Sequence, residues 1–438
     1  MKKYLFNSII IIIDLLLLVG LFYLTLFIRI SLNEFGLPMF NGLVLLDFSF
    51  VLLIVFFLMY YEGIYTFRYD FWQETQKVFK SFIVGFLMVL ALLTLTKMNL
   101  EYSRIFIGVY FVLSIILMPI LKRYSKKIIY SFDFFKKKAY VIGTDEQVDI
   151  FKKEFKNNWY LGQKYSKKNF DSVIISSKDL SVKKVNKLIT KYLSKDVELY
   201  VVPYITDINF IHSNIMEYSN IRCNTIQIEN KLLIKRSIII KNIFDKIATI
   251  LIFPLFMLIH LVVSLAIRFD SKGGVWFKQN RLGFDDKVFD VYKYRTMYED
   301  SDELLKEYLD KNKDEIKYYD KYHKYKNDPR ITTIGKLLRA TSLDELPQII
   351  NVLKGDMSLV GPRPYMITES DKLGKNQHFI LKVKPGITGL WQVSGRNELT
   401  FKERNELEIW YIKNWSLWAD FVILVKTLKV VINKVGAK

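Results

Sequence analysis

The chain has 438 residues and carries 64 Lys and Arg against 44 Asp and Glu, which gives a formal net charge of +20. Hydrophobic residues make up 51% of the chain and aromatic residues 15%, which excludes an intrinsically disordered protein. The single cysteine, Cys223, excludes a disulfide framework or a Cys-rich zinc site, and the four scattered histidines argue against a His-rich metal site. Nucleic-acid binding would explain the charge but not the apolarity, so no nucleic-acid partner is expected. A membrane protein with basic cytoplasmic surfaces explains both.

The first 125 residues contain four apolar stretches, and a bilayer span needs about 20 residues. We expect a bundle of four transmembrane helices within 1–125. The first stretch has no small-residue cleavage site and is followed by further spans, so it is not a signal peptide. Lys and Arg cluster before the first stretch, between the second and third, and after the fourth. The positive-inside rule therefore places the N-terminus and everything after the fourth span in the cytoplasm. The stretches are 8–28, 42–61, 81–96 and 105–121.

Two carboxylates, Asp14 and Asp47, fall inside these stretches. A charge within a bilayer is costly and is a default indication of a functional site. The favoured alternative is a hydrogen bond or packing contact between helices.

Residues 138–232 follow a βα pattern, which predicts a small Rossmann-like module with a parallel sheet. Strands are expected at 139–143, 172–176 and 198–203, with helices at 146–157 and 182–194. The first turn reads Gly143-Thr144-Asp145-Glu146, so it lacks the second and third glycines of a dinucleotide-binding fingerprint. Two carboxylates also stand where a pyrophosphate would lie, and we therefore expect no cofactor here.

The segment 328–364 carries the most informative residues. A helix is expected at 331–338, and Ser342-Leu343-Asp344-Glu345 matches a capping box that opens a second, amphipathic helix ending at Gly355. In a purely structural interpretation Ser342 caps this helix, Glu345 returns the hydrogen bond, and Asp344 complements the helix dipole.

The surroundings of this motif favour a chemical role. Arg339 precedes it, and Arg363 follows in Gly361-Pro362-Arg363-Pro364, where two prolines fix the backbone. A helix N-terminus keeps a carboxylate ionised and attracts phosphate. A carboxylate pair ringed by cations suits Mg²⁺-assisted phosphoryl transfer, in which a carboxylate holds the metal or attacks.

Two flanking stretches are of the same type. In 276–297, Gln279 to Gly283 are expected to form a turn, and Lys293 and Arg295 to alternate with tyrosines on a strand. In 384–396, the glycines 386, 389 and 395 suggest a backbone held close to a ligand. The alternatives are a solvated basic hairpin and an ordinary Gly-rich loop.

The apolar stretch 237–270 contains Pro254. A fifth full span would place the basic C-terminal third outside the cell, whereas nucleotide substrates are cytoplasmic. A helix that enters the bilayer, breaks at Pro254 and returns to the same face resolves this conflict. The alternative is an ordinary kinked span.

Five motifs occur in a fixed order along the C-terminal half: QNRLG, YKYRTM, LLRATSLDELPQ, NVLKGDMSLVGPRP and KPGITGLWQVSGR. Together they resemble the bacterial polyprenyl-phosphate hexose-1-phosphate transferases, or monotopic phosphoglycosyl transferases, over about 237–438. The preceding helices and module resemble the long branch of that family, which includes undecaprenyl-phosphate galactose and glucose phosphotransferases.

The resemblance implies a catalytic α/β domain at 237–438 with a re-entrant helix at 241–267, centred on Pro254. It implies transfer of a sugar 1-phosphate from a UDP-sugar, UDP-galactose or UDP-glucose, to undecaprenyl phosphate with release of UMP. This would be the first membrane step of O-antigen, capsule or exopolysaccharide synthesis. Asp344 would be the nucleophile of a covalent phosphosugar intermediate, with Glu345 as its partner and Mg²⁺ against both. Substrate phosphates would contact Lys293, Arg339 and Arg363, with Arg281, Arg295, Gln392 and Arg396 in the same motifs.

The resemblance also implies a multi-pass protein of the bacterial inner membrane, surrounded by lipid, with cytoplasmic soluble domains and a homodimeric assembly. The chain departs from the family pattern at three positions: Asn242 replaces an Arg, Phe253 precedes Pro254 in place of Ser, and Glu408 replaces an Asp. The charged insert 299–327 is expected to be a solvated helix over the site.

Two other functions remain open from the sequence. A membrane-anchored nucleotide-sugar dehydratase or epimerase would need a complete glycine fingerprint and a Tyr-x-x-x-Lys pair, and the glycines are absent. A non-enzymatic membrane scaffold would not depend on Asp344. No residue identifies the sugar.

Overall fold

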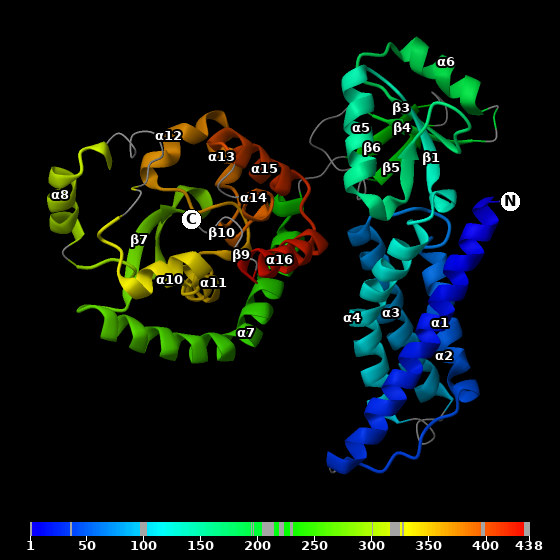
Figure 1. Cartoon of the computed structure of the whole chain (residues 1–438), viewed down its shortest axis with the longest axis horizontal. Coiled ribbons are helices and arrows are strands. Elements are labelled where there is room, and N and C mark those ends of the chain that lie inside the picture. Colours follow the sequence, from blue (N-terminus) through cyan, green and yellow to red (C-terminus); the bar gives the residue numbers. More distant parts are fainter. Residues whose placement is uncertain are drawn as a thin grey trace. The chain divides into compact units, whose positions relative to one another are not determined.

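The computed structural model divides the chain into two compact units, Met1–Ile205 and Thr206–Lys438, which we describe separately (Figure 1). The structure describes residues 2–35, 37–96, 103–193, 195, 197–203, 214–218, 223–227, 231–299, 301–315, 325, 328–395 and 399–432.

Four apolar helices open the first unit, as the sequence predicts. The first, third and fourth are long and apolar enough to cross a bilayer, whereas the second has 17 residues and lies at the lower limit for a span. In the bundle core, Phe48 packs against the rings of Phe22, Phe106 and Tyr110 at centroid distances of 4.9 to 5.3 Å. The helices are α1 (Lys2–Ser31), α2 (Leu45–Tyr61), α3 (Phe71–Leu95) and α4 (Arg104–Ile129).

A chain of buried charges links three of these helices. Asp14 of α1 forms an ion pair with Lys122 of α4, and Lys122 lies 3.2 Å from Glu74 of α3, which also pairs with Lys126. All four side chains are buried. The interpretation of Asp14 as an interhelical contact is therefore confirmed. Asp47 is exposed in the first turn of α2, at the edge of the helix and not in its interior.

The same unit ends in a module with a four-stranded parallel sheet in the order β2-β1-β3-β4. Three strands and both helices lie where the sequence predicts them, while the short strand β2 was not predicted. The parallel sheet is confirmed, and the Rossmann-like assignment stays a prediction. The elements are β1 (Lys137–Ile142), α5 (Asp145–Asn157), β2 (Gln163–Tyr165), β3 (Ser172–Ser176), α6 (Val182–Leu193) and β4 (Glu198–Val202).

The first turn of this module is filled by a side chain. Oε1 of Gln147 accepts a hydrogen bond of 3.0 Å from the Thr144 N–H, and a Cβ at Gly143 would collide with Gln147. In a dinucleotide-binding turn the ligand's pyrophosphate takes the backbone N–H groups that Gln147 caps here.

The second unit contains an antiparallel hairpin β5–β6, an antiparallel pair β7–β8 and a short parallel pair β9–β10.

The turn predicted at Gln279 to Gly283 is wrong, because strand β7 contains Gln279, Asn280 and Arg281. The chain reverses instead at Gly283–Lys287, where Asp285 and Asp286 adopt positive φ. The insert contains α8, and most of 316–327 lies outside the described residues. The elements are β5 (Asn214–Tyr218), β6 (Cys223–Gln227), α7 (Lys235–Asp270), β7 (Trp276–Leu282), β8 (Val288–Tyr294), α8 (Ser301–Lys311), α10 (Thr333–Thr341), α11 (Gln348–Lys354), β9 (Ser358–Val360), α12 (Ser370–Leu373), α13 (Gln377–Ile380), β10 (Gly386–Thr388), α14 (Leu390–Val393), α15 (Phe401–Lys413) and α16 (Leu417–Ile432).

Helix α7 runs unbroken through Pro254 for 36 residues, and its ribbon bends along its length (Figure 1). The expected interruption of the helix at Pro254 is therefore wrong. Both ends bind the rest of the unit. Near its start, Lys241 pairs with Asp420 of α16 at 2.6 Å, and at its end Asp270 accepts a hydrogen bond of 2.9 Å from the Ile334 N–H of α10.

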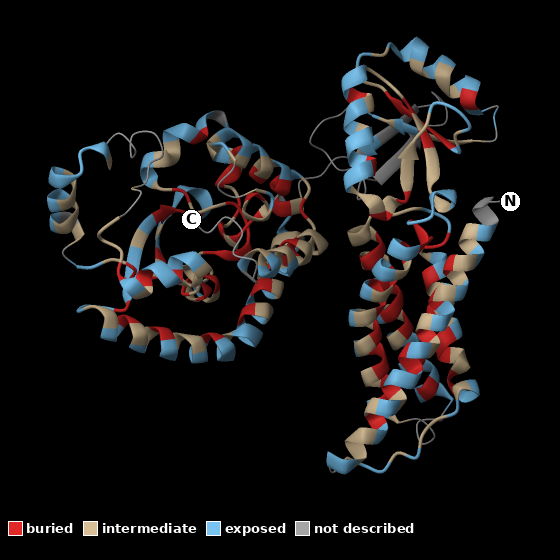
Figure 2. Cartoon of the chain, in the orientation of Figure 1, coloured by how far each residue is buried: buried red, intermediate tan, exposed pale blue. Residues whose placement is uncertain are grey.

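The outer face of α7 is apolar and exposed between these two anchors (Figure 2). Leu251, Leu255, Leu258 and Leu261 are each more than half exposed. An exposed apolar surface of this extent marks an interaction with a membrane or another apolar partner.

Candidate active site

The predicted Asp-Glu pair lies on a single 3₁₀ turn, η9 (Leu343–Glu345), between α10 and α11. Ser342 has a φ of +58°, and within the described segment 328–395 it makes no side-chain cap hydrogen bond to this turn. The expected capping box is therefore wrong. A left-handed residue here ends α10 and reverses the chain, so η9 is separate from α11. Helix α11 begins at Gln348 and ends at Lys354, where Gly355 caps it with a φ of +90°.

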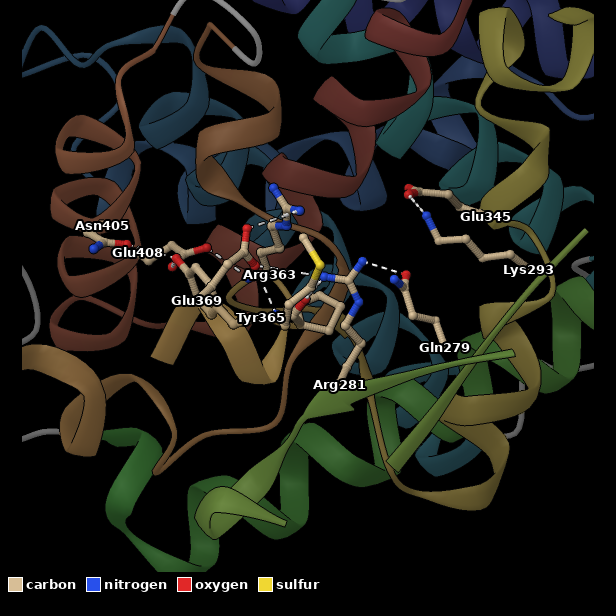
Figure 3. Close-up of polar contacts among 11 residues, drawn as sticks. Gln279, Arg281, Lys293, Glu345, Arg363, Tyr365, Glu369, Asn405 and Glu408 are labelled. Carbon is tan, nitrogen blue, oxygen red and sulfur yellow. Dashed lines mark hydrogen bonds and ion pairs between the residues drawn. The ribbon is translucent and has the colours of Figure 1, made fainter. Parts of the chain in front are cut away.

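Two predicted cations reach this turn. Nζ of Lys293, from β8, lies 2.7 Å from Oε1 of Glu345 (Figure 3). Nε of Arg339 donates a hydrogen bond of 2.9 Å to Oγ1 of Thr296, which orients the guanidinium, and its charge acts on Asp344. The structure therefore brings together Asp344, Glu345, Lys293 and Arg339 as the sequence predicts.

The Asp344 carboxyl is not kept acidic by a helix dipole, contrary to the expectation from the sequence. Burial raises its pKa to about 6, with the Glu345 charge acting in the same direction and Lys293 and Arg339 opposing them. A carboxylate that is poorly solvated and only partly balanced by cations is a better nucleophile than one fully paired in water.

A second cationic group comes from β7 and the Gly-Pro-Arg-Pro loop. Arg281 donates a hydrogen bond of 2.6 Å to Oε1 of Gln279 and lies 3.8 Å from Glu369, whose other oxygen is 3.9 Å from Arg363 (Figure 3). Burial lowers the pKa of Arg281, and the charge of Arg363 lowers it further. Two guanidiniums that share one carboxylate form a natural site for further negative charge, such as a phosphate.

The buried carboxyl of Glu408 lies next to the Arg281–Glu369–Arg363 group. The sequence indicated Glu408 only as a departure from the family pattern. Oε1 of Glu408 accepts a hydrogen bond of 2.8 Å from the Arg363 N–H, and Oε2 bonds with the Tyr365 hydroxyl. That hydroxyl also lies 2.8 Å from Oδ1 of Asn405. Burial raises the pKa of Glu408 to about 7. Because Tyr365 has one proton for two acceptors, a protonated Glu408 satisfies the network: Glu408 donates to Tyr365, and Tyr365 donates to Asn405.

Glu369, Tyr365 and Asn405 were missed by the sequence analysis. Glu369 falls in an irregular stretch without a motif, and Tyr365 and Asn405 read as ordinary core and helix-surface residues. The only available signal was the position of Tyr365 directly after the Gly-Pro-Arg-Pro loop.

Two other predicted residues, Arg295 and Gln392, do not join the site. Arg295 donates to the carbonyl oxygens of Ser271 and Lys272, so it fastens the end of α7 to β8. Gln392 donates to the Ile387 carbonyl at 3.3 Å within its own loop. Arg396 lies outside the described residues.

The expected role of the glycines at 386 and 389 is also different. A Cβ on either would collide with the backbone at Gly361, because β10, which starts at Gly386 and ends just before Gly389, runs against the start of the Gly-Pro-Arg-Pro loop. These glycines therefore allow the two backbone segments to pack directly against each other, and this packing fixes the loop that carries Arg363.

The carboxylates of Asp344 and Glu345 match the way in which Mg²⁺ is usually held. Among the described residues there is no group of three or more His, Cys, Asp or Glu suited to a metal ion. Mg²⁺ commonly binds through one or two carboxylates together with substrate phosphate oxygens, and the Asp-Glu turn supplies that number. The residues present therefore fit a substrate-dependent Mg²⁺ site.

Known proteins resemble both parts of the chain. The model of the bacterial sugar transferase family matches residues 236–434. The undecaprenyl-phosphate galactose phosphotransferase of Salmonella typhimurium is 32% identical over 413 residues, covering 85% of this chain and 84% of the relative. An uncharacterized sugar transferase of Haemophilus influenzae is 34% identical, covering 85% of each chain. The UDP-glucose:undecaprenyl-phosphate glucose-1-phosphate transferase of Klebsiella pneumoniae is 40% identical over 209 residues, covering 45% of this chain and 41% of the relative. The chain belongs to the bacterial sugar transferase family of polyprenyl-phosphate hexose-1-phosphate transferases.

Proposed function

We propose that this protein transfers a sugar 1-phosphate from a UDP-sugar to undecaprenyl phosphate and releases UMP. The observation that carries the proposal is the half-buried Asp344 carboxyl, with its raised pKa, beside the Glu345–Lys293 pair and Arg339. The full-length relative in Salmonella is named for galactose phosphate transfer and the Klebsiella relative for glucose phosphate transfer, so UDP-galactose and UDP-glucose are the first substrates to test.

The reaction would proceed in two displacements at one phosphorus atom. An oxygen of Asp344 attacks the β-phosphorus of the UDP-sugar, the bond from that phosphorus to the bridging oxygen breaks, and UMP leaves with the electron pair. A phosphate oxygen of undecaprenyl phosphate then attacks the same phosphorus and releases the Asp344 carboxylate. Such carboxylate nucleophiles are known in other phosphoryl transfers.

The cations of the site have separate tasks in this scheme. Lys293 and Arg339 lie near the attacking carboxylate and would neutralise charge that spreads over the transferring phosphate. Arg281 and Arg363, which share Glu369, would hold the second phosphate of the nucleotide. Mg²⁺ held by Asp344 and Glu345 would supply further electrostatic stabilisation of the phosphate oxygens.

We also propose that the catalytic unit is monotopic, with α7 entering and leaving the bilayer on one face. A straight helix of 36 residues would be about 54 Å long, and the hydrocarbon core is about 30 Å thick, so a crossing helix would separate its ends by the whole membrane. Both ends of α7 instead bind the same globular unit, through Asp420 and through the Ile334 N–H. The Lys and Arg distribution of the first unit supports a cytoplasmic position for that face, and the family resemblance supports a location in the bacterial inner membrane.

Cysteine labelling tests this topology. The native Cys223 is replaced by Ser, and single cysteines are introduced as Glu307→Cys on α8 or Met39→Cys between α1 and α2, both at exposed positions. In spheroplasts, an impermeant maleimide should label Met39→Cys directly and Glu307→Cys only after permeabilisation. Direct labelling of Glu307→Cys would contradict the re-entrant arrangement.

The chemistry is tested with UDP-sugar carrying ³²P at the β-phosphate, in the absence of lipid acceptor. Label should remain on the denatured protein, map to the peptide with Asp344, and be absent from Asp344→Asn. Asp356→Asn, a carboxylate one helix away, is the matched control and should keep the label. An active enzyme without an adduct under rapid quench would mean direct transfer from nucleotide to lipid. The implied homodimer is tested by light scattering of the purified protein.

A further inference from the structure

The first unit contains a cavity of about 600 Å³ between the helical bundle and the α/β module, unconnected with the residues of the proposed reaction. Its walls come from the first turns of α1, the loop between α2 and α3, the end of α4 and the edge of the module. All of these segments belong to one compact unit.

The module side of this cavity is cationic. Five Lys and Arg side chains line it against two carboxylates, Asp171 and Glu198. Some of the charge is already balanced, because Lys137 pairs with Glu198 and Lys126 with Glu74. Arg68 and Lys195 have no carboxylate within ion-pair distance among the described residues.

Arg68 is the most informative of these cations. Its guanidinium donates to two neutral acceptors, the carbonyl oxygens of Gly162 and Phe135, and its carbon lies 4.5 Å from the ring centroid of Phe6. Burial lowers the pKa of this side chain, so its charge is held away from water. Two of its five N–H groups are used by the carbonyls, and the charges of Asp171 and Glu198 act on it only from beyond ion-pair distance. A partly buried cation in this position is stabilised further by an anionic ligand.

The bundle side of the cavity is apolar. Phe6, Ile10, Ile64 and Phe67 line it, from α1 and from the loop that carries Arg68. A cavity with cations on one wall and hydrocarbon on the other fits a molecule with a phosphate head and an apolar tail. The positive charge of the loop between α2 and α3 is typical of the cytoplasmic side of a membrane protein, and the cytoplasmic leaflet contains the anionic lipids.

We propose that this cavity binds the phosphate head of an anionic membrane lipid, with Arg68 and Lys195 as its contacts. The guanidinium fork matches phosphate geometry, and Lys195 adds a flexible second charge. The site would fasten the α/β module to the bilayer surface through a lipid shared by the module and the bundle. This proposal does not depend on the proposed reaction.

The test uses the full-length protein in a neutral detergent, with native mass spectrometry of bound phosphatidylglycerol and phosphatidylcholine. We expect retention of phosphatidylglycerol over phosphatidylcholine, and at least a fivefold loss of that retention in Lys195→Gln and in Arg68→Gln. Lys195 is exposed, so its replacement keeps the fold even where the loss of Arg68 does not. Lys187→Gln, an exposed lysine on α6 of the same module, is the control with the same change of charge and should behave as the parent.

Two outcomes would overturn the assignment. Equal retention of phosphatidylglycerol by Lys195→Gln and Lys187→Gln would show that the lipid binds elsewhere. Displacement of phosphatidylglycerol by millimolar inorganic phosphate, with no preference between the two lipids, would show that the cavity takes free phosphate and not a lipid head.

Discussion

The backbone N–H of Arg363 donates a hydrogen bond of 2.8 Å to Oε1 of Glu408, a buried carboxyl 45 residues further along the chain. The hydrogen bond is made by the peptide group, so the guanidinium remains directed towards Glu369 and Arg281. Glu408 therefore acts on the site through the backbone of Arg363, as a positioning residue.

The first prediction concerns Glu408. Glu408→Gln keeps an acceptor for the Arg363 N–H and a donor for Tyr365, so activity should stay within a few-fold of the parent. Glu408→Ala leaves the Arg363 N–H without its acceptor, which costs about 1–3 kcal/mol and frees the Arg363 loop, while the Tyr365 hydroxyl keeps only its hydrogen bond to Asn405. UMP release and melting temperature measure both effects. If Gln is as damaging as Ala, the site needs an ionised Glu408, and the neutral-acid network is wrong.

The second prediction concerns the stability of the metal-free protein and Asp344. Folded Asp344 keeps its proton up to a pKa of about 6, whereas an aspartate in the unfolded chain has its ordinary pKa of 3.8. Between pH 3.8 and about pH 6 the folded state binds more protons than the unfolded state. The free energy of unfolding therefore falls as the pH rises through this range, and it stays lower at higher pH. Asp344→Asn removes a penalty of up to about 3 kcal/mol. In EDTA, its melting temperature should exceed that of the parent at pH 7.5 and match it at pH 4. A lower melting temperature at pH 7.5 would identify Asp344 as a structural cap.

The third prediction concerns Mg²⁺. Added Mg²⁺ together with UDP should raise the melting temperature of the parent protein, because the ion relieves the repulsion between Asp344 and Glu345. Asp344→Asn and Glu345→Gln should each lose most of this rise, while Asp356→Asn should keep it. An equal rise in all four proteins would place the ion elsewhere.

The fourth prediction concerns the first anchor of α7. Lys241→Met leaves Asp420 fully buried without its cation, although Tyr411 and Trp415 still donate to it at 2.7 and 2.9 Å. Breaking a buried pair in this way costs about 3–5 kcal/mol. Lys241→Met with Asp420→Asn should recover part of the loss, and the coupling is read from the double-mutant cycle of melting temperatures. Additive losses would mean that the pair does not hold the helix.

The sequence predicts well those features that depend on local pattern. Helix and strand positions in the module follow from runs of apolar residues, and the C-terminal end of α11 follows from Gly355. Asp344, Glu345, Lys293 and Arg339 were identified from two motifs separated by about 40 residues, and β8 and η9 bring them together.

The features that failed depend on tertiary context. Ser342 has the sequence of a capping box, but its left-handed backbone turns the chain away from a continuous helix. The pKa of Asp344 is set by burial, which no local pattern reports. Gln279 and Arg281 resemble turn residues because they are polar, yet cross-strand pairing with β8 holds them in a strand.

The link between Lys241 and Asp420 has a consequence for the synthesis of the protein. The two residues are 179 positions apart, so at about 5–20 residues per second the ribosome adds Asp420 roughly 10–35 seconds after Lys241. During that interval the helix has emerged with its lysine unpaired and its apolar face exposed, and no part of α16 exists to receive it. A nascent helix in this condition is best held at the membrane–water boundary, where the lysine reaches water and the leucines reach lipid. The order in which the chain is made thus favours a shallow helix at the membrane surface, and α16 completes the catalytic unit after that helix has been made.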